Sequence, residues 1–219
     1  MSGADRKLPN PLPLLLVGLG LSGCVTQRMD IRLLPPPAKP YSASIQMTVS
    51  LRSHGFTAQG GCAADPALGA RIELRSPSGA ARFLLLIERD RARIMDVRRG
   101  LVFAWTTPSQ EIPWAPSDLW FLFTGRVPAG IRTLRATEKG TTAISWDNGL
   151  GTVDCHLEPQ SSLPLGYVRA DCRAPGGTEI KVAWKSFQSG SFPESAFEPP
   201  PGLAFTAASL EDVLREPSP

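Results

Sequence analysis

The sequence is poor in the residues on which most catalytic and metal sites depend. Among its 219 residues there are two histidines, His54 and His156, and four cysteines. We expect His54 in a turn and His156 on the polar face of a strand, where each is solvated or structural. We identify no phosphate-binding glycine loop, no nucleophile-elbow serine and no Cys-x-x-Cys pair. The sequence therefore predicts neither an enzyme nor a metal or cofactor site.

Excess charge and long apolar runs are also scarce. Lysine and arginine number 23 against 20 aspartates and glutamates, and the basic residues are scattered, which argues against a nucleic-acid partner. Outside the N-terminus there is no apolar run of about 18 residues, the minimum for a membrane-spanning helix. The composition, 42% hydrophobic and 20% charged, is typical of one globular domain.

Residues 1–23 have the parts of a secretory signal peptide. Two basic residues precede an apolar stretch, Leu12 to Leu21, that is too short to span a membrane. The sequence Leu-Ser-Gly-Cys follows and ends at Cys24. It resembles the bacterial lipobox, in which the cysteine thiol is diacylated and the new amino group is acylated after cleavage. We therefore expect a covalent lipid on Cys24 that anchors the chain to a membrane lipid layer.

Two further features describe how the anchored chain is placed. Val25 follows the cysteine. An Asp at this position would resemble the signal that retains lipoproteins in the inner membrane, so its absence favours the periplasmic face of the outer membrane. The rest of residues 24–40 is rich in proline, including Pro35–Pro37, and is predicted to be an extended tether.

Most of the remaining chain alternates between apolar and polar residues, the pattern of half-buried strands. Glycine, proline and Asn-Gly signals separate these strands, as in an antiparallel meander that closes into a sandwich or barrel. The strands are predicted at 44–52, 56–62, 71–75, 83–87, 91–97, 101–105, 131–135, 144–147, 152–158, 167–173 and 179–185. We expect a mainly β domain whose sheet is strongly curved, with an aromatic concave face and a solvated convex face.

A short helix is predicted at about 117–124, inside this curved sheet. Ser117 occupies the expected N-cap, Asp118 places a negative charge in the first turn, and Gly125 is a natural C-terminal cap. The residues between are apolar on every side of the helix, which requires cover on most sides. We therefore expect this helix to cover the concave face of the sheet.

Large apolar side chains on the helix and the inward strand faces have two interpretations: they line a ligand cavity, or they fill a core. The candidate cavity-lining residues are Phe103, Trp105, Leu119, Trp120, Phe121, Phe123, Trp146 and Trp184, with Trp114 nearby. In the cavity interpretation the helix opens as a lid, with Gly125 and Gly130 as candidate hinges.

The cysteines offer one candidate disulfide. Cys155 and Cys172 lie on inward faces of two strands joined by one loop, and would face each other in a symmetric hairpin. They either form a bridge, which would contribute about 3 kcal/mol in the loop-entropy model, or remain two small buried side chains. Cys62 would be left unpaired and buried.

The order of these elements resembles the LolA/LolB-like fold, and within it the LolB-like outer-membrane lipoproteins, over roughly Tyr41 to Leu203. The match rests on the lipobox, the tether and three loose motifs, at 70–79, at 117–128 and at 192–202. This resemblance implies an unclosed antiparallel half-barrel at 41–205, with short helices as a lid and a hydrophobic cavity for acyl chains. Residues 206–219 would be a tail with a short helix near Ser209–Asp212.

The resemblance predicts a membrane-anchored periplasmic lipoprotein that binds acyl chains of lipoproteins or lipids, in lipoprotein localisation or lipid handling. The alternative is an accessory lipoprotein that is not a carrier and docks onto an outer-membrane or envelope protein complex. One position departs from the family pattern. Where LolB carries an exposed apolar loop residue that helps to insert lipoproteins, this chain has Ser78, so the insertion role does not carry over.

Overall fold

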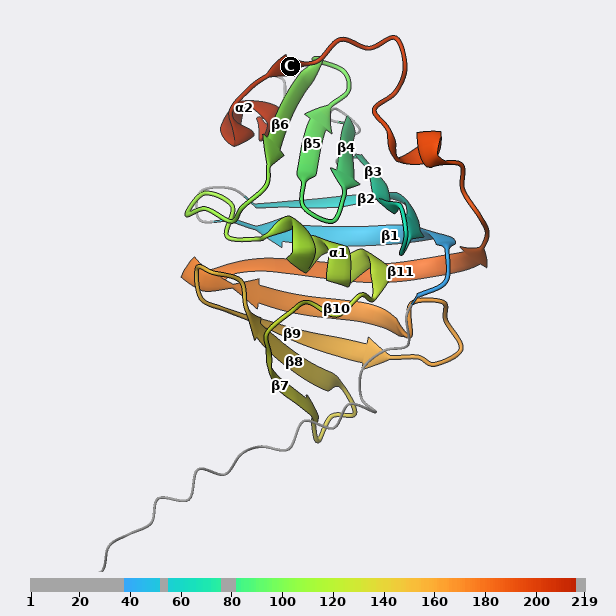
Figure 1. The fold of residues 1–219 in the computed structure, drawn as a ribbon, viewed down its shortest axis with the longest axis vertical. Helices are drawn as coiled ribbons and strands as arrows, with labels where there is room; N and C mark the ends of the chain where they lie inside the picture. Colours follow the sequence, from blue (N-terminus) through green and yellow to red (C-terminus); the bar gives the residue numbers. More distant parts are fainter. Residues whose placement is uncertain (1–37, 52–54, 76–81, 216–219) are drawn as a thin grey trace, which may run out of the picture.

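A computed structural model of the chain describes residues 38–51, 55–75 and 82–215. These residues form one sheet of 12 strands that curves around a helix, α1 (Pro116–Thr124) (Figure 1). The strands are β1 (Tyr41–Ser50), β2 (Gly55–Asp65), β3 (Gly69–Arg75), β4 (Arg82–Ile87), β5 (Ala92–Asp96), β6 (Leu101–Trp105), β7 (Ile131–Ala136), β8 (Thr142–Asp147), β9 (Thr152–Pro159), β10 (Tyr167–Ala174), β11 (Thr178–Ser189) and β12 (Thr206–Ala207).

The sheet is an open antiparallel meander. Its order is β12-β6-β5-β4-β3-β2-β1-β11-β10-β9-β8-β7, so the first and last long strands of the chain, β1 and β11, pair in its middle. All neighbours are antiparallel except β12, which pairs parallel with β6. In the described residues nothing pairs β12 with β7, so the sheet stays unclosed. The predicted fold class, a mainly β, unclosed and curved sheet with a short apolar helix, is confirmed.

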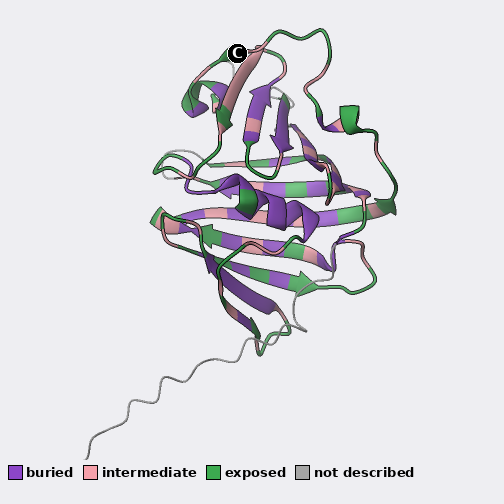
Figure 2. Ribbon diagram, in the orientation of Figure 1, coloured by how far each residue is buried: buried purple, intermediate pink, exposed green. Residues whose placement is uncertain are grey.

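Alternation of burial explains why the strands were visible in the sequence. In β9, for example, Val153, Cys155 and Leu157 are buried while their neighbours Asp154 and His156 are exposed. The inward side chains merge with α1 into one large core, and Figure 2 shows α1 buried along nearly its whole length. None of the helices in the described residues is both long and apolar enough to cross a membrane.

One position of β2, Gly60, requires glycine for a purely steric reason. A Cβ on Gly60 would lie 1.7 Å from the carbonyl oxygen of Glu73 on the neighbouring strand β3. Because real Cβ atoms do not approach so closely, only glycine lets these two strands keep their pairing here.

The N-cap prediction for α1 is wrong. The cap residue is Ala115, and Ser117 lies inside the first turn as an exposed residue. Pro116 takes the first helical position, where a missing N–H is harmless, and this moves the start of the helix back. The side chain that serves the helix start is Asp118, whose Oδ2 accepts from the Ala115 N–H at 2.8 Å. Gly125 ends the helix with a φ of 67°, as predicted.

The segment after β11 is more ordered than the sequence suggested. β11 runs on to Ser189, beyond the predicted end of its strand, and a 3₁₀ helix, η3 (Glu194–Phe197), follows. β12 is only two residues long, too short to produce a visible alternation. A final helix, α2 (Leu210–Leu214), begins after Ser209, whose hydroxyl accepts from the Asp212 N–H at 3.1 Å.

Candidate apolar ligand pocket

The N-terminal turn of α1 is fixed by one buried carboxylate. Asp118 is 2% exposed, and its Oδ1 accepts from Trp146 Nε1 of β8 at 2.6 Å. Its Oδ2 accepts from Asn148 Nδ2 at 2.9 Å, in addition to the Ala115 N–H. Asn148 also donates to the carbonyl of Pro113 at 2.8 Å, so the turn after β8 holds the segment before α1. Three donors therefore satisfy a carboxylate that burial would otherwise penalise.

Burial and hydrogen bonding have opposite effects on the Asp118 carboxyl. Loss of solvent raises its pKa, while hydrogen bonds from Asn148, Trp146 and the Ala115 backbone lower it. Burial is the larger effect, and the pKa lies above the ordinary value of 3.8. Because every contact of this carboxylate is to the scaffold around the helix, we assign it a structural role.

The C-terminal end of α1 is fixed by two buried tyrosines from the two strands that flank β11. Tyr41 of β1 donates its hydroxyl to the carbonyl of Phe123 at 2.8 Å. Tyr167 of β10 donates to the carbonyl of Leu122 at 2.8 Å, with a second contact to Phe121 at 3.2 Å. The carbonyls of Leu122 and Phe123 belong to the last turn, where intrahelical partners are missing, while that of Phe121 also accepts from the Gly125 N–H. Burial raises the pKa of both tyrosines well above 10.0, so the hydroxyls remain donors.

Aromatic rings fill the space around this end of the helix. Phe121 lies against Trp146 with ring centroids 5.3 Å apart, and Phe123 lies against Trp184 at 5.8 Å, both edge to face. All four side chains are at most 1% exposed. The structure thus places these four candidate cavity residues in a packed core. A swing of α1 about Gly125 would break both tyrosine contacts and this aromatic packing.

The other candidate residues lie toward the start of α1. Trp120 is 7% exposed at the core boundary, and Phe103 and Trp105 of β6 are half-buried with ring centroids 5.9 Å apart. Trp105 Nε1 donates to the carbonyl of Trp114 at 2.9 Å, so the ring is oriented with its apolar face free for packing. Trp105 and Leu119 are brought together on the wall of one pocket.

This pocket is lined by apolar side chains alone. Its walls come from the inner faces of β1 to β6 and β11, the segment before α1, the first turn of α1, and α2. The lining residues are Met47, Val49, Leu51, Phe56, Leu74, Leu85, Ile94, Trp105, Ile112, Trp114, Leu119, Ile180, Leu210 and Leu214. Its volume is about 60 Å³, close to the share of two water molecules in the liquid at ~30 Å³ each.

Of these lining residues, sequence reasoning named only Trp105 and Leu119 as candidates, with Trp114 nearby, and missed the other eleven. Ile112 stands in a proline-flanked loop with no periodicity to mark it. Leu210 and Leu214 are four residues apart, the spacing that puts two side chains on one face of a helix, and this signal was available. The inward positions of β1 and β3 followed from alternation, although nothing in that alternation distinguishes a pocket wall from a filled core.

The outer face of the sheet carries a second, polar hollow of about 500 Å³ on β7 to β11. Its lining includes Arg135, Asp154, His156 and Lys181. His156 is exposed there, and no hydrogen bond or ion pair of its side chain is found within the described ranges. The lining mixes both charges, and apart from the buried Ser145 its polar groups are half-buried or exposed, which gives this hollow no clear ligand chemistry.

The cysteines are placed as follows. Cys155 and Cys172 are direct partners in the β9–β10 register and are joined by a disulfide bond in the structure. Cys62 is a free, buried cysteine, and burial raises the pKa of its thiol to about 12, partly offset by a hydrogen bond with Tyr41. A thiol with that pKa is protonated at neutral pH and is a poor nucleophile.

The predictions for the N-terminus and for Ser78 concern residues outside those that the structure describes. They are the signal peptide at 1–23, the lipidation site Cys24, the tether up to residue 37, and Ser78.

Comparison with known proteins adds similarity of fold at low identity. No family model matches the chain, and no curated protein matches it. A LolA superfamily protein from Nitrosomonas europaea is 8% identical, with a TM-score of 0.48, over 76% of this chain and 93% of that one. A putative outer-membrane lipoprotein-sorting protein domain from Vibrio parahaemolyticus is 11% identical, with a TM-score of 0.42, over 73% and 89%.

A third similar structure is a DUF1329 family protein from Desulfovibrio piger. It is 9% identical, with a TM-score of 0.41, over 77% of this chain and 93% of that one. At these scores the similarities carry no functional argument, so the interpretation of the pocket rests on its own residues.

Proposed function

We propose that this protein binds an acyl chain, of a lipid or of a lipid-modified protein, in the pocket between α1, α2 and strands β1 to β6. The observation that carries the proposal is the chemistry of the lining, which exposes no polar atom to the pocket. A polar ligand would lose its hydrogen bonds to water there without replacement. An acyl chain gains about 25 cal/mol for each Å² of apolar surface that leaves water.

The size of the pocket adds a requirement. At about 60 Å³ it lies well below the ~300 Å³ at which pockets begin to hold small ligands. A bound chain therefore extends beyond the pocket or displaces part of its wall. The strands of the wall are tied into the sheet and α1 is fixed at both ends, which leaves few parts that can move.

The proposed setting is a lipoprotein anchored through Cys24 to the outer membrane, with the domain on the periplasmic side. This part rests on the resemblance of residues 21–24 to the lipobox. In that setting the ligand would be a lipid or a lipoprotein, and the process would be lipoprotein localisation or lipid handling. The pocket residues would bind the ligand non-covalently and would not catalyse a reaction.

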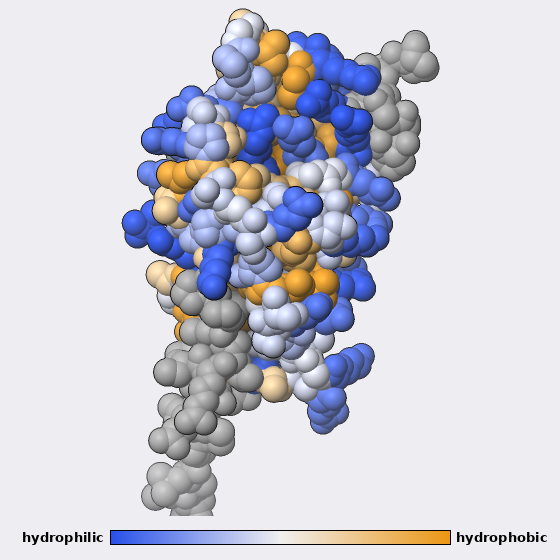
Figure 3. Space-filling view, turned by 90° about the vertical axis from the view of Figure 1, so that its right-hand side faces the viewer, coloured by the Kyte–Doolittle hydropathy of each residue, from blue (hydrophilic) through white to orange (hydrophobic). Residues whose placement is uncertain are grey.

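An accessory docking role would be supported by a broad apolar surface outside the pocket. In the described residues the exposed large hydrophobic side chains are Leu150 at 44% and Leu203 at 46%, on separate loops. The face seen in Figure 3 mixes hydrophilic and hydrophobic side chains. These observations favour the binding role.

Native mass spectrometry of the protein purified without detergent, with Cys24→Ser to remove the anchor, tests the proposal. We expect adducts with the masses of fatty acids or phospholipids. Leu51→Asp, in the pocket wall and half-buried, should abolish them because it puts a charge among apolar groups. Leu150→Asp, an exposed leucine away from the lining, is the matched control and should retain them.

If the protein with an unaltered pocket showed only the mass of the ligand-free chain, even after fatty acid was added, the binding role would be contradicted. Equal loss of adducts in both leucine variants would show that the ligand sits elsewhere. Circular dichroism of both variants establishes that the fold persists.

A further inference from the structure

A hollow lined by arginines lies where the end of β3, the start of β4 and the turn after β5 meet. Its volume is about 330 Å³, and its lining within the described residues is Arg75, Arg82, Val97 and Arg98. This volume reaches the ~300 Å³ at which pockets begin to hold small ligands. In contrast to the hollow on β7 to β11, the charged groups described in this lining are all positive. The lining of this arginine hollow therefore indicates an anionic ligand.

The strand register brings the arginines together. Arg75 ends β3 and is the direct partner of Arg82, which begins β4. The Val97 N–H donates to the carbonyl of Arg82 at 3.2 Å, and Arg98 follows in the chain. Like charges directly opposite each other in a strand pair are destabilising. An anion between the two guanidinium groups would remove this repulsion.

The arginine hollow and the apolar pocket lie on opposite faces of the sheet. Leu74 is 1% exposed and lines the apolar pocket on the inner face, while Arg75, the next residue, is exposed. Phe83 belongs to the inner core, while Arg82, the residue before it, is exposed. Successive side chains of a strand point to opposite faces, so both arginines point outward. A ligand of the arginine hollow is therefore separate from the acyl chain proposed above.

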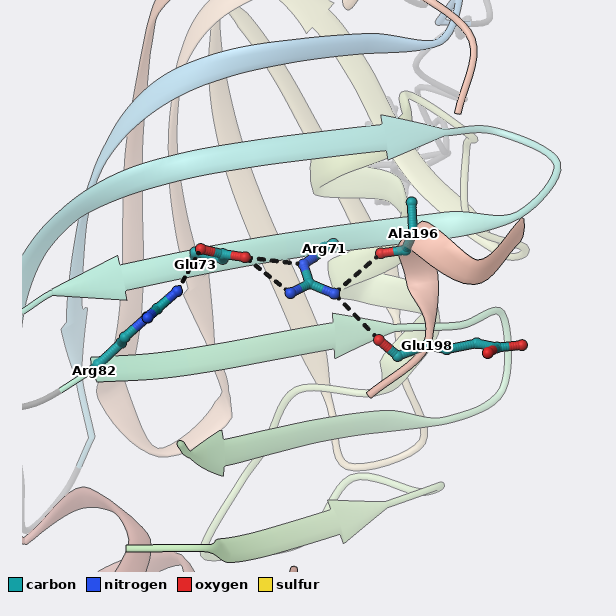
Figure 4. Close-up of polar contacts among 5 residues, drawn as sticks. All are labelled: Arg71, Glu73, Arg82, Ala196 and Glu198. Atoms are coloured by element: carbon teal, nitrogen blue, oxygen red, sulfur yellow. Dashed lines mark hydrogen bonds and ion pairs between the residues drawn. The ribbon is translucent and has the colours of Figure 1, made fainter. Parts of the chain in front are cut away.

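The carboxylate nearest to this row is already held by another arginine. Glu73 Oε1 accepts from Nε and Nη2 of Arg71, at 3.1 and 2.9 Å, and its Oε2 accepts from Nη2 of Arg82 at 3.2 Å (Figure 4). Arg71 is also occupied by the carbonyls of Ala196 and Glu198. Among the described residues Arg82 has no further partner, so most of its five donors are available to a ligand.

The second carboxylate of this region does not neutralise the hollow either. Asp96 is 1% exposed and accepts from Arg99 Nε at 2.6 Å and from the backbone N–H groups of Arg98 and Arg99, at 2.9 and 3.0 Å. Arg99 also donates to the carbonyl of Val213 in α2, at 2.7 Å. Asp96 therefore fixes the turn that carries Arg98. For the Arg75 side chain no hydrogen bond or ion pair is found within the described ranges, so its charge is not compensated.

We propose that the arginine hollow binds a phosphate group, held chiefly by Arg75 and Arg82 with Arg98 beside them. The guanidinium fork matches phosphate oxygens in pairs, and such charge-assisted hydrogen bonds are strong. A phosphate group has three acceptor oxygens, enough for more than one arginine to share it. The same chemistry is offered by the headgroup of a phospholipid at a membrane surface and by a soluble phosphate compound. The inference does not depend on the proposed acyl-chain binding.

The first arm of the test uses inorganic phosphate and the full chain carrying Cys24→Ser. The backbone amide NMR signals of Val97 and Arg98 should shift saturably as phosphate replaces chloride at constant ionic strength. The double variant Arg75→Gln, Arg82→Gln should weaken phosphate binding about tenfold or more, because each lost guanidinium removes charge-assisted hydrogen bonds. Circular dichroism establishes that the fold persists, which is expected because both side chains are exposed.

A matched control removes the same charge from the opposite edge of the sheet. Arg132 and Arg135 are exposed on β7, and Arg132 is paired with Asp147 as Arg82 is with Glu73. The double variant Arg132→Gln, Arg135→Gln should bind phosphate as the starting protein does. If both double variants lost binding equally, the effect would be one of net charge, and the site would be overturned.

The second arm distinguishes the two sources of the phosphate. Vesicles of phosphatidylcholine alone are compared with vesicles of equal parts phosphatidylcholine and phosphatidylglycerol, and bound protein is measured by sedimentation. If the ligand is a lipid headgroup, the preference for phosphatidylglycerol should fall about tenfold in the Arg75→Gln, Arg82→Gln variant and persist in the β7 control. If only inorganic phosphate distinguishes the two double variants, the ligand is a soluble phosphate compound. If neither probe distinguishes them, the proposed site is wrong.

Discussion

The two helices on the concave side of the sheet are both short and both apolar toward the core, yet they are held very differently. α1 is fixed by a buried carboxylate at its start and by two tyrosine hydroxyls at its end. α2 is attached through one carbonyl, a serine cap and a few apolar contacts. Apolar character alone therefore does not determine how firmly a helix is held, because the polar contacts at the ends of the two helices differ.

The largest effect is expected from removal of the Asp118 carboxylate. Asp118→Ala leaves Trp146 Nε1, the Asn148 amide and the Ala115 N–H without their acceptor, and should lower the free energy of unfolding by about 3–5 kcal/mol. Urea unfolding followed by tryptophan fluorescence measures this. Asp118→Asn keeps one acceptor oxygen and should lose less. A change below 1 kcal/mol for Asp118→Ala would mean that this carboxylate does not fix α1.

The disulfide strengthens the half of the sheet on which the end of α1 rests. It joins Cys155 to Cys172, which are 17 residues apart, and a loop of that length is worth about 3 kcal/mol in the loop-entropy model. The Cys155→Ala, Cys172→Ala double variant should lose stability by this amount, as judged by the denaturation midpoint. Cys62→Ala, without a bridge, is the comparison for simple loss of a buried sulfur. An equal loss of stability in the double variant and in Cys62→Ala would mean that the disulfide itself does not stabilise the fold.

A matched pair of single-hydroxyl changes compares the two helices directly. Tyr167→Phe leaves the carbonyl of Leu122 unsatisfied in the core, and should lower the free energy of unfolding by about 1–2 kcal/mol. Ser209→Ala, at the exposed cap of α2, should lower the free energy of global unfolding by less than about 0.5 kcal/mol, because no strand pairing of the sheet passes through α2. If Ser209→Ala destabilised the whole protein as much as Tyr167→Phe, α2 would be part of the same cooperative unit as α1.

The smallest expected effect is a pH dependence at α1. The folded pKa of Asp118 is raised, chiefly by burial, so the folded state holds this proton more tightly than the unfolded state. Its contribution to stability therefore increases as pH falls through the folded pKa toward 3.8. Relative to Asp118→Asn, the unmodified protein should gain free energy of unfolding over that range. The opposite slope would show that hydrogen bonds to the ionised form outweigh burial.

Glu73 of β3 is a carboxylate with the opposite pKa shift. Burial alone would raise its pKa, but hydrogen bonds and charges from Arg71 and Arg82 outweigh this and lower the pKa below 4.5. Its contribution to stability is present above the unfolded pKa and is lost as pH falls through the folded one. Both members of the Asp118 comparison contain Glu73, so its effect cancels there.

The sequence predicted the strands because one face of each is buried, and burial on one face imposes a period of two. It predicted α1 from an unbroken apolar run closed by Gly125. It placed the N-cap two residues too late, at Ser117 and not Ala115, because Pro116 also favours the first helical position. β12 was not predicted because a strand of two residues is too short to show alternation. Its pairing with β6 also depends on the path of the chain after β11, which local sequence does not specify.

The site was harder to predict than the fold, for a physical reason. Trp105, Trp146 and Trp184 look alike in the sequence, since each alternates with polar neighbours on a strand. Two of them pack into the core with Phe121 and Phe123, and only Trp105 faces the pocket. The difference arises from where α1 rests across the sheet, which is set by Asp118, Tyr41 and Tyr167 together. The local sequence pattern does not specify where α1 lies across the sheet.

The central claim, that an acyl chain binds between Trp105, Leu119 and α2, is tested most directly by a crystal structure with a brominated fatty acid. The account predicts anomalous bromine density among these side chains, with α1 unmoved. Bromine beneath the C-terminal end of α1, with Phe121 and Phe123 swung out, would contradict it, and so would crystals that take up no bromine at all.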